Sequence, residues 1–468
     1  MQVENRSSYL LKNTIIFALG NFGTKFITFF LVPFYTSALT TAEYGVIDLI
    51  YTVGMVLVPV LTLNISEAVL RFPLDKDADT TKIMSIGLIY TTIALIISIC
   101  IFPFLVKMHT IGIYAEYMVL YMVSLMLHQL CMSYLRGKEL LLQYAIGNIV
   151  HANLVASLNI YFLAICDKGI EGYLLAYVIA NVVVAIYAAY YGNIINVIRN
   201  FSFDRKLALS MVKYSAVLIP NSFMWWIMNS ADRIMISTMV GVAANGIYAV
   251  SYKLPTLLTT VSSVFNQAWS YSAIKENDSV DKKEYNNIVY DRLVSVIVLL
   301  SMGLLVILKD FLKIYVSNEY YEAWLYIPIL IVGFVFMTLG SFVATSYTVY
   351  KDSRGFLCSG TVGAIGNLVL NWVLIPQINV MGAAIATATS YFIVFVYRVL
   401  DTKKYLELDV LKKKHVYGYI LLMLAIITIY FDNKIAFVLL IVELLLTIVN
   451  FRQTVFAVWD FILNKINR

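Results

Sequence analysis

Long apolar runs, separated by short polar or charged stretches, follow one another along the chain. A transmembrane helix needs roughly 20 mostly apolar residues, and the runs predict about fourteen such spans. Their ranges are 12–35, 45–70, 83–106, 115–135, 144–165, 172–192, 211–237, 246–274, 291–308, 323–350, 356–376, 381–399, 416–431 and 435–451. The first run contains Lys25 and no small-residue cleavage site follows it, so we interpret it as a span and not as a signal peptide.

The composition agrees with this pattern. Of the 468 residues, 61% are apolar and 13% are charged. Soluble domains are nearer half apolar and a quarter charged, so the chain has too much apolar surface for one water-facing core. Disordered, collagen-like, zinc-finger and small disulfide-scaffold proteins are excluded as well. The sequence therefore predicts an all-α polytopic membrane protein.

The positions of the 34 Lys and Arg residues predict how the spans are oriented. Alternate connections, including both termini, hold 26 of these cations, while the other connections hold only five. Cytoplasmic connections are rich in Lys and Arg, so both termini are predicted to be cytoplasmic, in a multi-pass protein of the bacterial cytoplasmic (inner) membrane. The five outer cations are Lys107, Lys168, Lys309, Lys313 and Lys434. Topology alone explains the net charge of +6, and no nucleic-acid partner is expected.

A weak internal repeat, offset by about 200 residues, divides the first twelve spans into two sets of six. Glu43–Ile47 parallels Ala244–Tyr248, and Leu158–Ile160 parallels Leu370–Trp372. Two pseudo-symmetric six-helix lobes of the same orientation would enclose a central cavity. The predicted divisions are an N-lobe at 1–192 (spans 1–6), a cytoplasmic connection at 193–210, a C-lobe at 211–399 (spans 7–12), a cytoplasmic linker at 400–415, and spans 13 and 14 with a cytoplasmic tail at 416–468.

Polar residues recur at helical spacing along one face of the first two spans of each repeat. An ionisable group at mid-bilayer costs several kcal/mol, so these faces are expected to line an aqueous cavity. The rows are Asn21, Thr24, Lys25 and Thr28 in span 1; Asp48, Thr52, Met55, Pro59, Thr62 and Ser66 in span 2; Asn221, Trp225, Asn229 and Arg233 in span 7; and Lys253, Thr256, Thr260, Ser263 and Gln267 in span 8.

Three cations remain that are counted with neither set of connections, namely Lys25, Arg233 and Lys253, and all three fall inside predicted spans. Desolvated ammonium and guanidinium groups bind phosphate and pyrophosphate strongly, so these residues are predicted to hold an anionic head group. The polar lining of the cavity is predicted to include Asn21, Thr24, Asn229, Thr256 and Thr260.

Each of these assignments has a plainer alternative. Lys25 could instead pair with another residue in a purely structural role, and Arg233 could form a local ion pair with Asp232. Lys253 could extend its ammonium group to the membrane surface. Asp48 is a candidate site for a coupling ion, lying close to one end of its span. Tyr248 and Tyr252 flank the row in span 8 and are candidates for stacking on sugar rings.

The sequence contains no recognisable catalytic or metal-binding pattern. Its cysteines, Cys100, Cys131, Cys166 and Cys358, are scattered, and its four histidines form no HExxH motif. There is no P-loop, and no connection is long enough for a soluble nucleotide-binding domain. We therefore expect a protein that is not an enzyme, with no catalytic residues, no bound metal and no direct use of ATP.

Several segments carry a family resemblance. They are Glu43-Tyr44-Gly45; Asn229-Ser230-Ala231-Asp232-Arg233-Ile234; Gly246-Ile247-Tyr248 with Tyr252-Lys253; Ser317-Asn318-Glu319-Tyr320 with Ala323 and Pro328; and Leu370-Asn371-Trp372 through Pro376 to Gly382-Ala383-Ala384-Ile385-Ala386-Thr387. Together, and in this order, they resemble the multidrug/oligosaccharidyl-lipid/polysaccharide (MOP) exporter superfamily, specifically its Wzx-type flippases of O-antigen and capsule repeat units.

The resemblance implies a MATE-like fold of two six-helix lobes around a cationic cavity. It also implies alternating access that carries an undecaprenyl-pyrophosphate-linked oligosaccharide to the outer leaflet for cell-surface polysaccharide biosynthesis, with no cofactor and with coupling to an H⁺ or Na⁺ gradient in some members. Lys25, Arg233 and Lys253 would contact the pyrophosphate or acidic sugars. The expected partners are this lipid-linked oligosaccharide, the membrane lipids and polysaccharide assembly proteins.

Three other functions stay open. A cation-coupled multidrug or metabolite exporter is less favoured because the deep charges are positive, whereas cationic drugs require carboxylates. A lipid II flippase shares the two additional helices, but the second span of this chain has no deep cation. A membrane polysaccharide polymerase is the least favoured, because no outer connection is long enough for a catalytic surface.

Overall fold

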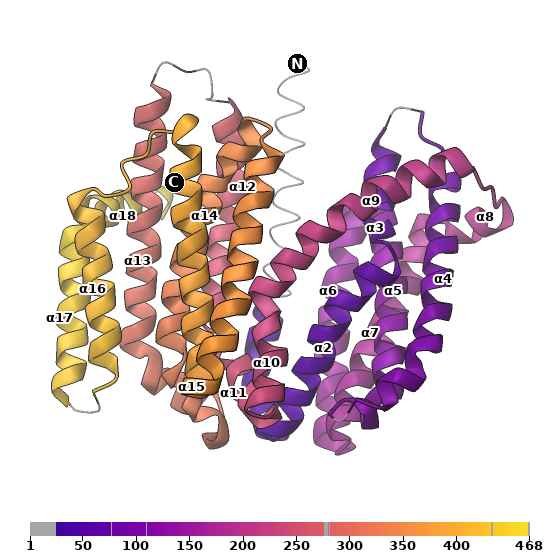
Figure 1. Ribbon diagram of the computed structural model, residues 1–468, viewed down its shortest axis with the longest axis horizontal. Helices are drawn as coiled ribbons and strands as arrows, with labels where there is room; N and C mark the ends of the chain where they lie inside the picture. Colours follow the sequence, from indigo (N-terminus) through magenta and orange to yellow (C-terminus); the bar gives the residue numbers. More distant parts are fainter. Residues whose placement is uncertain are drawn as a thin grey trace. The chain divides into compact units, whose positions relative to one another are not determined.

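The computed structural model describes residues 25–75, 77–108, 110–275, 279, 281–431 and 434–466 (Figure 1). Within these ranges the chain is built from helices and has no strand, which confirms the predicted all-α class. Nine helices in this part of the chain are long and apolar enough to cross a membrane. The total of fourteen spans stays a prediction.

The chain forms two compact units. Unit 1 comprises the residues up to Trp226 together with Gly241–Gly246, and unit 2 comprises Ile227–Val240 and the residues from Ile247 onward. The first division between the units lies inside the predicted span 211–237 and not in the predicted connection 193–210.

Unit 1 is an assembly of antiparallel helices. After a helical segment at 25–38, its elements are α2 (Thr41–Leu61), α3 (Ile65–Arg71), η1 (Phe72–Leu74), α4 (Thr80–Val106), η2 (Gly112–Tyr114), α5 (Ala115–Gly137), α6 (Leu141–Asn159), the π-helical turn η3 (Ile160–Ile165), α7 (Gly169–Gly192), α8 (Ile194–Arg199) and α9 (Arg205–Trp226). A cluster of buried apolar side chains from α3, α4, α5, α7, α8 and α9 forms a core.

The start and the end of α2 have clear local causes. Thr40 and Glu43 form a capping box, in which the Thr40 side chain accepts the Glu43 N–H and the Glu43 carboxylate accepts the Thr40 N–H at 2.9 Å. Near the other end, Pro59 has no N–H to donate within the helix. Leu63 and Asn64 then adopt a left-handed φ of 51°, so the predicted span 45–70 is broken into α2 and α3.

Unit 2 contains the remaining helices. They are the π-helical turn η4 (Ile227–Ala231), α10 (Asp232–Met239), most of α11 (Val242–Ser251), α12 (Pro255–Lys275), α13 (Lys282–Tyr315), η5 (Asn318–Leu325), α14 (Ile327–Val349), α15 (Ser353–Asp401), η6 (Thr402–Lys404), α16 (Lys413–Ile429), α17 (Lys434–Asn450) and α18 (Arg452–Ile466). Helix α14 is the centre of this unit, because 83% of its most apolar stretch is buried.

Helix α15 joins the two predicted spans 356–376 and 381–399 through a kink. Ile378 and Asn379 have non-helical backbone angles, two residues after Pro376. Beyond the kink, a Cβ atom on Gly382 would lie 2.4 Å from the carbonyl oxygen of Leu374, so only glycine fits this close approach.

The first turn of α15 is capped by Asp352. Its Oδ1 accepts the N–H of Gly355 at 2.9 Å, and its Oδ2 lies 3.2 Å from the ammonium group of Lys404. The hydrogen bond from the Gly355 N–H is the main cause that holds the pKa of the Asp352 carboxyl below its usual range, and the hydrogen bond from Lys404 is the second. Charge pairing therefore ties the start of α15 to η6, which follows its end.

The buried cation Arg398 is held inside unit 2. Only 2% of the residue is exposed. Its Nε donates to Ser359 Oγ and its Nη1 donates to the carbonyl of Gly340, both at 3.0 Å. Ser359 precedes the kink of α15, Arg398 follows it, and Gly340 is in α14. The two bonds therefore join both arms of α15, before and after the kink, to α14.

Removing the Ser359 hydroxyl is expected to destabilise unit 2. A hydrogen bond to a charged group is worth about 1.5–3 kcal/mol, so Ser359→Ala is expected to lower the Tm of the purified protein in dodecyl maltoside by several degrees. Thr361→Ala in the same helix is the control, because the Thr361 hydroxyl is exposed and bonds to the Leu357 carbonyl of its own helix. Equal Tm values for the two variants would contradict the role assigned to Ser359.

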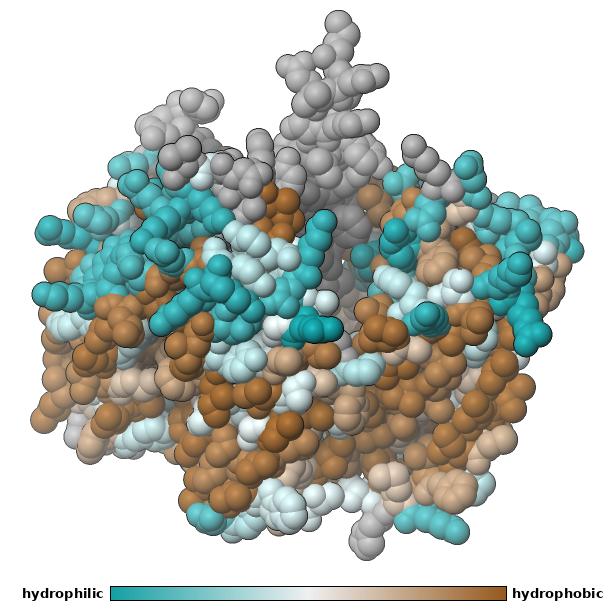
Figure 2. Space-filling model, turned by 45° about the horizontal axis from the view of Figure 1, so that its top comes forward, coloured by the Kyte–Doolittle hydropathy of each residue, from teal (hydrophilic) through white to brown (hydrophobic). Residues whose placement is uncertain are grey.

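The surface matches a membrane environment. On the face shown in Figure 2, hydrophobic residues predominate over the lower part of each unit, and hydrophilic residues gather towards the upper end. Helix α17 illustrates this, because its exposed side chains include Phe437, Val438, Leu439, Val442 and Leu445. Such a surface is stable against lipid and unstable in water, so the multi-pass membrane character follows from both sequence and structure.

Candidate functional site

A buried carboxylate, Asp232, organises a polar cluster in unit 2. Asp232 is the first residue of α10 and is fully buried. Its Oδ2 accepts hydrogen bonds from the hydroxyls of Tyr248 (2.7 Å), Tyr252 (2.9 Å) and Thr387 (3.2 Å), and its Oδ1 accepts the backbone N–H of Arg233 (3.0 Å). Hydroxyl groups from α11, the turn that follows it and α15 therefore compensate for the burial of this charge.

The cluster continues as a chain of amides along α15. The Asn367 amide donates towards Thr387 Oγ1 at 3.5 Å, and the Asn371 amide donates to Asn367 Oδ1 at 2.9 Å. All three residues are completely buried. A second link joins α15 to the predicted row in span 7, because Tyr391 donates its hydroxyl hydrogen to Asn229 Oδ1 at 2.6 Å.

The predicted cation Arg233 lies beside this cluster. It is half-buried, and its guanidinium carbon is 5.1 Å from the centre of the Tyr252 ring. A guanidinium group over an aromatic face is held by cation–π attraction as well as by charge. Arg233 is therefore fixed to the same tyrosine that donates to Asp232.

The second predicted cation, Lys253, lies in the turn between α11 and α12. Its backbone N–H bonds to Val250, and α12 begins two residues later at Pro255. The predicted span 246–274 is thus interrupted here. Thr256 and Thr260, the predicted lining residues, are on α12, and their hydroxyls bond to carbonyls one turn earlier in the chain.

The remaining predicted residues are in unit 1. Lys25 is exposed at the start of the described chain, while Asn21 and Thr24 lie outside the described residues. Asp48 is buried in α2, and its Oδ2 accepts the side-chain amide of Asn245 at 3.3 Å. The same amide also donates to the carbonyl of Gly45 at 3.0 Å.

The structure brings part of the predicted site together. Within unit 2, Arg233 lies beside the Asp232 cluster through its contact with Tyr252, and Asn229 accepts a hydrogen bond from Tyr391 of α15. The expectation that Tyr248 and Tyr252 stack on sugars is wrong, because both are buried and both hydroxyls bond to Asp232.

Sequence reasoning missed the contribution of α15. Asn367 and Asn371 are four residues apart, as are Thr387 and Tyr391, so each pair lies on one face of its arm. This spacing is the signal that would have identified spans 11 and 12 as part of the polar cluster.

Residues 10–271 match the model of a family described as "Polysaccharide biosynthesis protein". The chain belongs to this family. Agl15 of Haloferax volcanii, named a probable low-salt glycan biosynthesis flippase, is 22% identical over 399 residues, which cover 82% of this chain and 81% of the relative.

Solved structures show the same fold. A lipid II flippase, MurJ, in an inward closed conformation has a TM-score of 0.69 and 13% identity, and the alignment covers 97% of this chain and 100% of MurJ. A multidrug resistance MATE transporter of the MOP superfamily, in an inward-facing conformation, has a TM-score of 0.65 and 14% identity, with 87% and 95% coverage. The predicted MATE-like fold is confirmed.

Proposed function

We propose that the chain is a flippase that moves a polyprenyl-pyrophosphate-linked oligosaccharide repeat unit across the bacterial cytoplasmic membrane, for cell-surface polysaccharide biosynthesis. The observation that carries the proposal is the family match over residues 10–271. The likeness to a glycan biosynthesis flippase over 82% of the chain supports it. No enzymatic step and no cofactor are part of the proposal.

In the proposed mechanism, cationic side chains bind the anionic head group while the polyprenyl chain stays in the lipid. Arg233 and Lys253 suit this role, since both are half-buried, Arg233 contacts the Tyr252 ring, and Lys253 follows Tyr252 in the sequence. Lys25, which is in unit 1, is a further candidate contact for the head group. Alternating exposure of the binding cavity to the two sides of the membrane would then release the substrate in the outer leaflet.

Coupling to an H⁺ or Na⁺ gradient is part of the proposal. Two buried carboxylates are candidates for the coupling site, Asp48 in unit 1 and Asp232 in unit 2. Asp232 is the stronger candidate, because its carboxylate collects three hydroxyl donors from separate parts of unit 2. Buried carboxylates inside membrane proteins commonly serve ion or proton transfer.

Changing Lys253 to Ala is expected to test the binding role directly. Losing one charge-assisted contact to a pyrophosphate costs about 1.5–3 kcal/mol, so surface polysaccharide is expected to fall about tenfold or more at equal protein level. Lys25→Ala is expected to act in the same direction. Surface polymer would be measured in a strain that depends on this chain for its export.

Lys206→Ala is the control, since Lys206 is an exposed residue at the start of α9. Undiminished polymer in the Lys253→Ala and Lys25→Ala strains would contradict the assigned cavity. Sensitivity to drugs on deletion of the chain, with intact surface glycan, would indicate an exporter of another substrate.

A further inference from the structure

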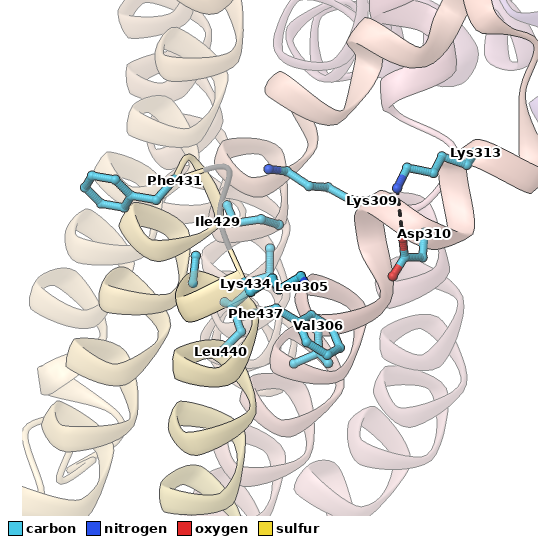
Figure 3. Close-up of a pocket in the computed structure, with 11 residues that line it drawn as sticks. Leu305, Val306, Lys309, Asp310, Lys313, Ile429, Phe431, Lys434, Phe437 and Leu440 are labelled. Carbon is cyan, nitrogen blue, oxygen red and sulfur yellow. Dashed lines mark hydrogen bonds and ion pairs between the residues drawn. The ribbon is translucent and has the colours of Figure 1, made fainter.

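A cleft in unit 2 lies between α13 and the hairpin of α16 and α17. Its volume is about 380 Å³. Figure 3 shows the lining side chains, which come from the second half of α13, the end of α16 and the start of α17. They are Leu305, Val306, Lys309, Asp310, Lys313, Ile429, Phe431, Lys434, Ala436, Phe437 and Leu440. We call this the α13–α17 cleft. Asp432 and Asn433 lie outside the described residues.

Lysines are rare on the predicted outer side of the membrane, and most of them line this cleft. Lys309, Lys313 and Lys434 are three of the five cations predicted on the outer side of the membrane. The other two, Lys107 and Lys168, are in unit 1, at the end of α4 and the start of α7. Lysines that only reach the membrane surface would be spread over the ends of many helices. The concentration of Lys309, Lys313 and Lys434 around one cleft therefore indicates a binding role.

The cleft has a positively charged rim. Among its described lining residues there are three ammonium groups and one carboxylate, a net charge of two. Lys313 lies 3.1 Å from Asp310, and the Lys309 ammonium lies 4.1 Å from the centre of the Trp324 ring. Figure 3 shows the Lys309 side chain extended towards the side of the cleft formed by α16 and α17.

The wall of the cleft is held in place before any ligand arrives. Trp324 is in η5, and its ring centre lies 5.8 Å from that of Tyr430, at the end of α16. Tyr430 donates its hydroxyl hydrogen to the carbonyl of Leu325 at 2.6 Å. The aromatic ring under Lys309 is therefore anchored to the opposite side of the cleft.

Charged and apolar residues occupy different depths. On α13, Lys313 is two residues from the helix end, Lys309 is six, and Leu305 is one further turn inside, about 6 Å deeper at 1.5 Å per residue. On α17, Lys434 is the first residue, and Phe437 and Leu440 follow towards the interior. A ligand that fits this gradient has an anionic head at the membrane surface and a hydrocarbon chain below it.

We propose that the α13–α17 cleft binds the pyrophosphate head group of a polyprenyl-linked lipid in the outer leaflet, with the start of its chain against Phe437 and Leu440. The net charge of two among the described lining residues matches a pyrophosphate diester, which carries two negative charges, whereas most phospholipid head groups carry one. This inference rests on the proposed function. It adds a site in which the lipid is held after it has left the transport cavity.

Photolabelling of the full-length protein tests the site. The probe is farnesyl pyrophosphate carrying a diazirine on its prenyl chain, added to purified protein in dodecyl maltoside micelles. After illumination, labelled peptides are mapped by mass spectrometry. We expect label in 305–313 and 434–440, and displacement of it by unmodified farnesyl pyrophosphate but not by equal concentrations of farnesol or phosphatidylglycerol.

Variants separate charge from folding. Lys309→Gln with Lys434→Gln keeps the Lys313–Asp310 pair and is expected to lower labelling of the cleft at least about tenfold. Lys107→Gln with Lys168→Gln removes the same number of outer charges and is expected to leave the label unchanged. Tm values and gel filtration confirm that both double variants are folded.

Equal labelling of the cleft in the two double variants, or label confined to other segments, would overturn the proposal. Displacement by phosphatidylglycerol as effective as that by farnesyl pyrophosphate would also overturn it, in favour of a bulk phospholipid. The labelling needs no transport, so it is independent of the surface polysaccharide assay. A labelled cleft in a chain whose Lys253→Ala variant exports normally would refute the proposed transport cavity and leave the lipid site standing.

Discussion

Gly246→Val is expected to abolish surface polysaccharide and to prevent recovery of folded protein. A Cβ atom on Gly246 would lie 1.9 Å from the carbonyl oxygen of Thr41, and one on Gly45 would lie 1.9 Å from that of Val242. Each oxygen belongs to the residue four positions before the other glycine. The clashing atoms are backbone atoms in helices, so no side-chain rotation relieves the overlap, and the cost is expected to exceed about 3 kcal/mol.

The measurement is the yield and Tm of purified protein together with surface polymer. Gly303→Ala in α13 is the matched control, because nothing lies within 4 Å of a Cβ atom at that position. The control is expected to retain both folding and export. Normal yield and export for Gly246→Val would mean that the first turns of α2 and α11 are not in contact in the membrane.

Asp232→Ala is expected to produce the second largest loss. It would remove the acceptor shared by three buried hydroxyls, those of Tyr248, Tyr252 and Thr387. Each buried hydroxyl left without a partner costs about 1–3 kcal/mol, so we expect a Tm lower by about 10 °C or more and no detectable export.

Asp232→Asn separates structure from ion coupling. An amide retains one oxygen acceptor, so this variant is expected to regain much of the Tm while export stays low, if the carboxylate carries the coupling charge. Tyr391→Phe is the control, since it removes a hydroxyl that donates to Asn229 Oδ1 and leaves the Asp232 contacts intact. Full export by Asp232→Asn would contradict the coupling role and leave the structural one.

The contact between Gly45 and Gly246 illustrates how far the sequence could be interpreted. The two glycines occupy equivalent positions in the repeat, and the structure places them against each other with nearly identical geometry. The sequence shows their equivalence but not their contact, because a weak repeat carries no information about distance. Only the packing of α2 against the first turn of α11 makes both glycines necessary.

The polar rows in the spans identified which helix faces are kept away from lipid, but not whether a face meets an aqueous cavity or a neighbouring helix. Asn229 and Arg233 lie at the expected spacing and both contact tyrosines of unit 2. Tyr248 and Tyr252, expected to stack on sugar rings, donate to a buried carboxylate instead. A period of 3.6 residues identifies a polar face but does not tell an aqueous cavity from a helix interface. Thr387, which completes the Asp232 cluster, is 155 residues away in sequence, so no local pattern links the two.

Single prolines lie next to the places where the predicted spans are bent or interrupted. Pro376 lies two residues before the kink of α15, and Pro59 lies near the end of α2, although neither was used to predict a break. The turn around Lys253 was not expected, because the sequence Tyr252-Lys253-Leu254 carries no glycine and its proline follows the turn. Proline at the first position of α12 is the signal of a new helix start.

The kink in α15 has a practical consequence for anyone working on intact cells. Two spans are joined there by a bend at Ile378 and Asn379 in place of a loop, on the side predicted to face outward. Proteases added from outside need an extended stretch of several residues, so this connection is expected to resist cleavage even though Ile378 is exposed. An epitope tag inserted between these two residues would disrupt a continuous helical element, and topology mapping would be better served by other positions.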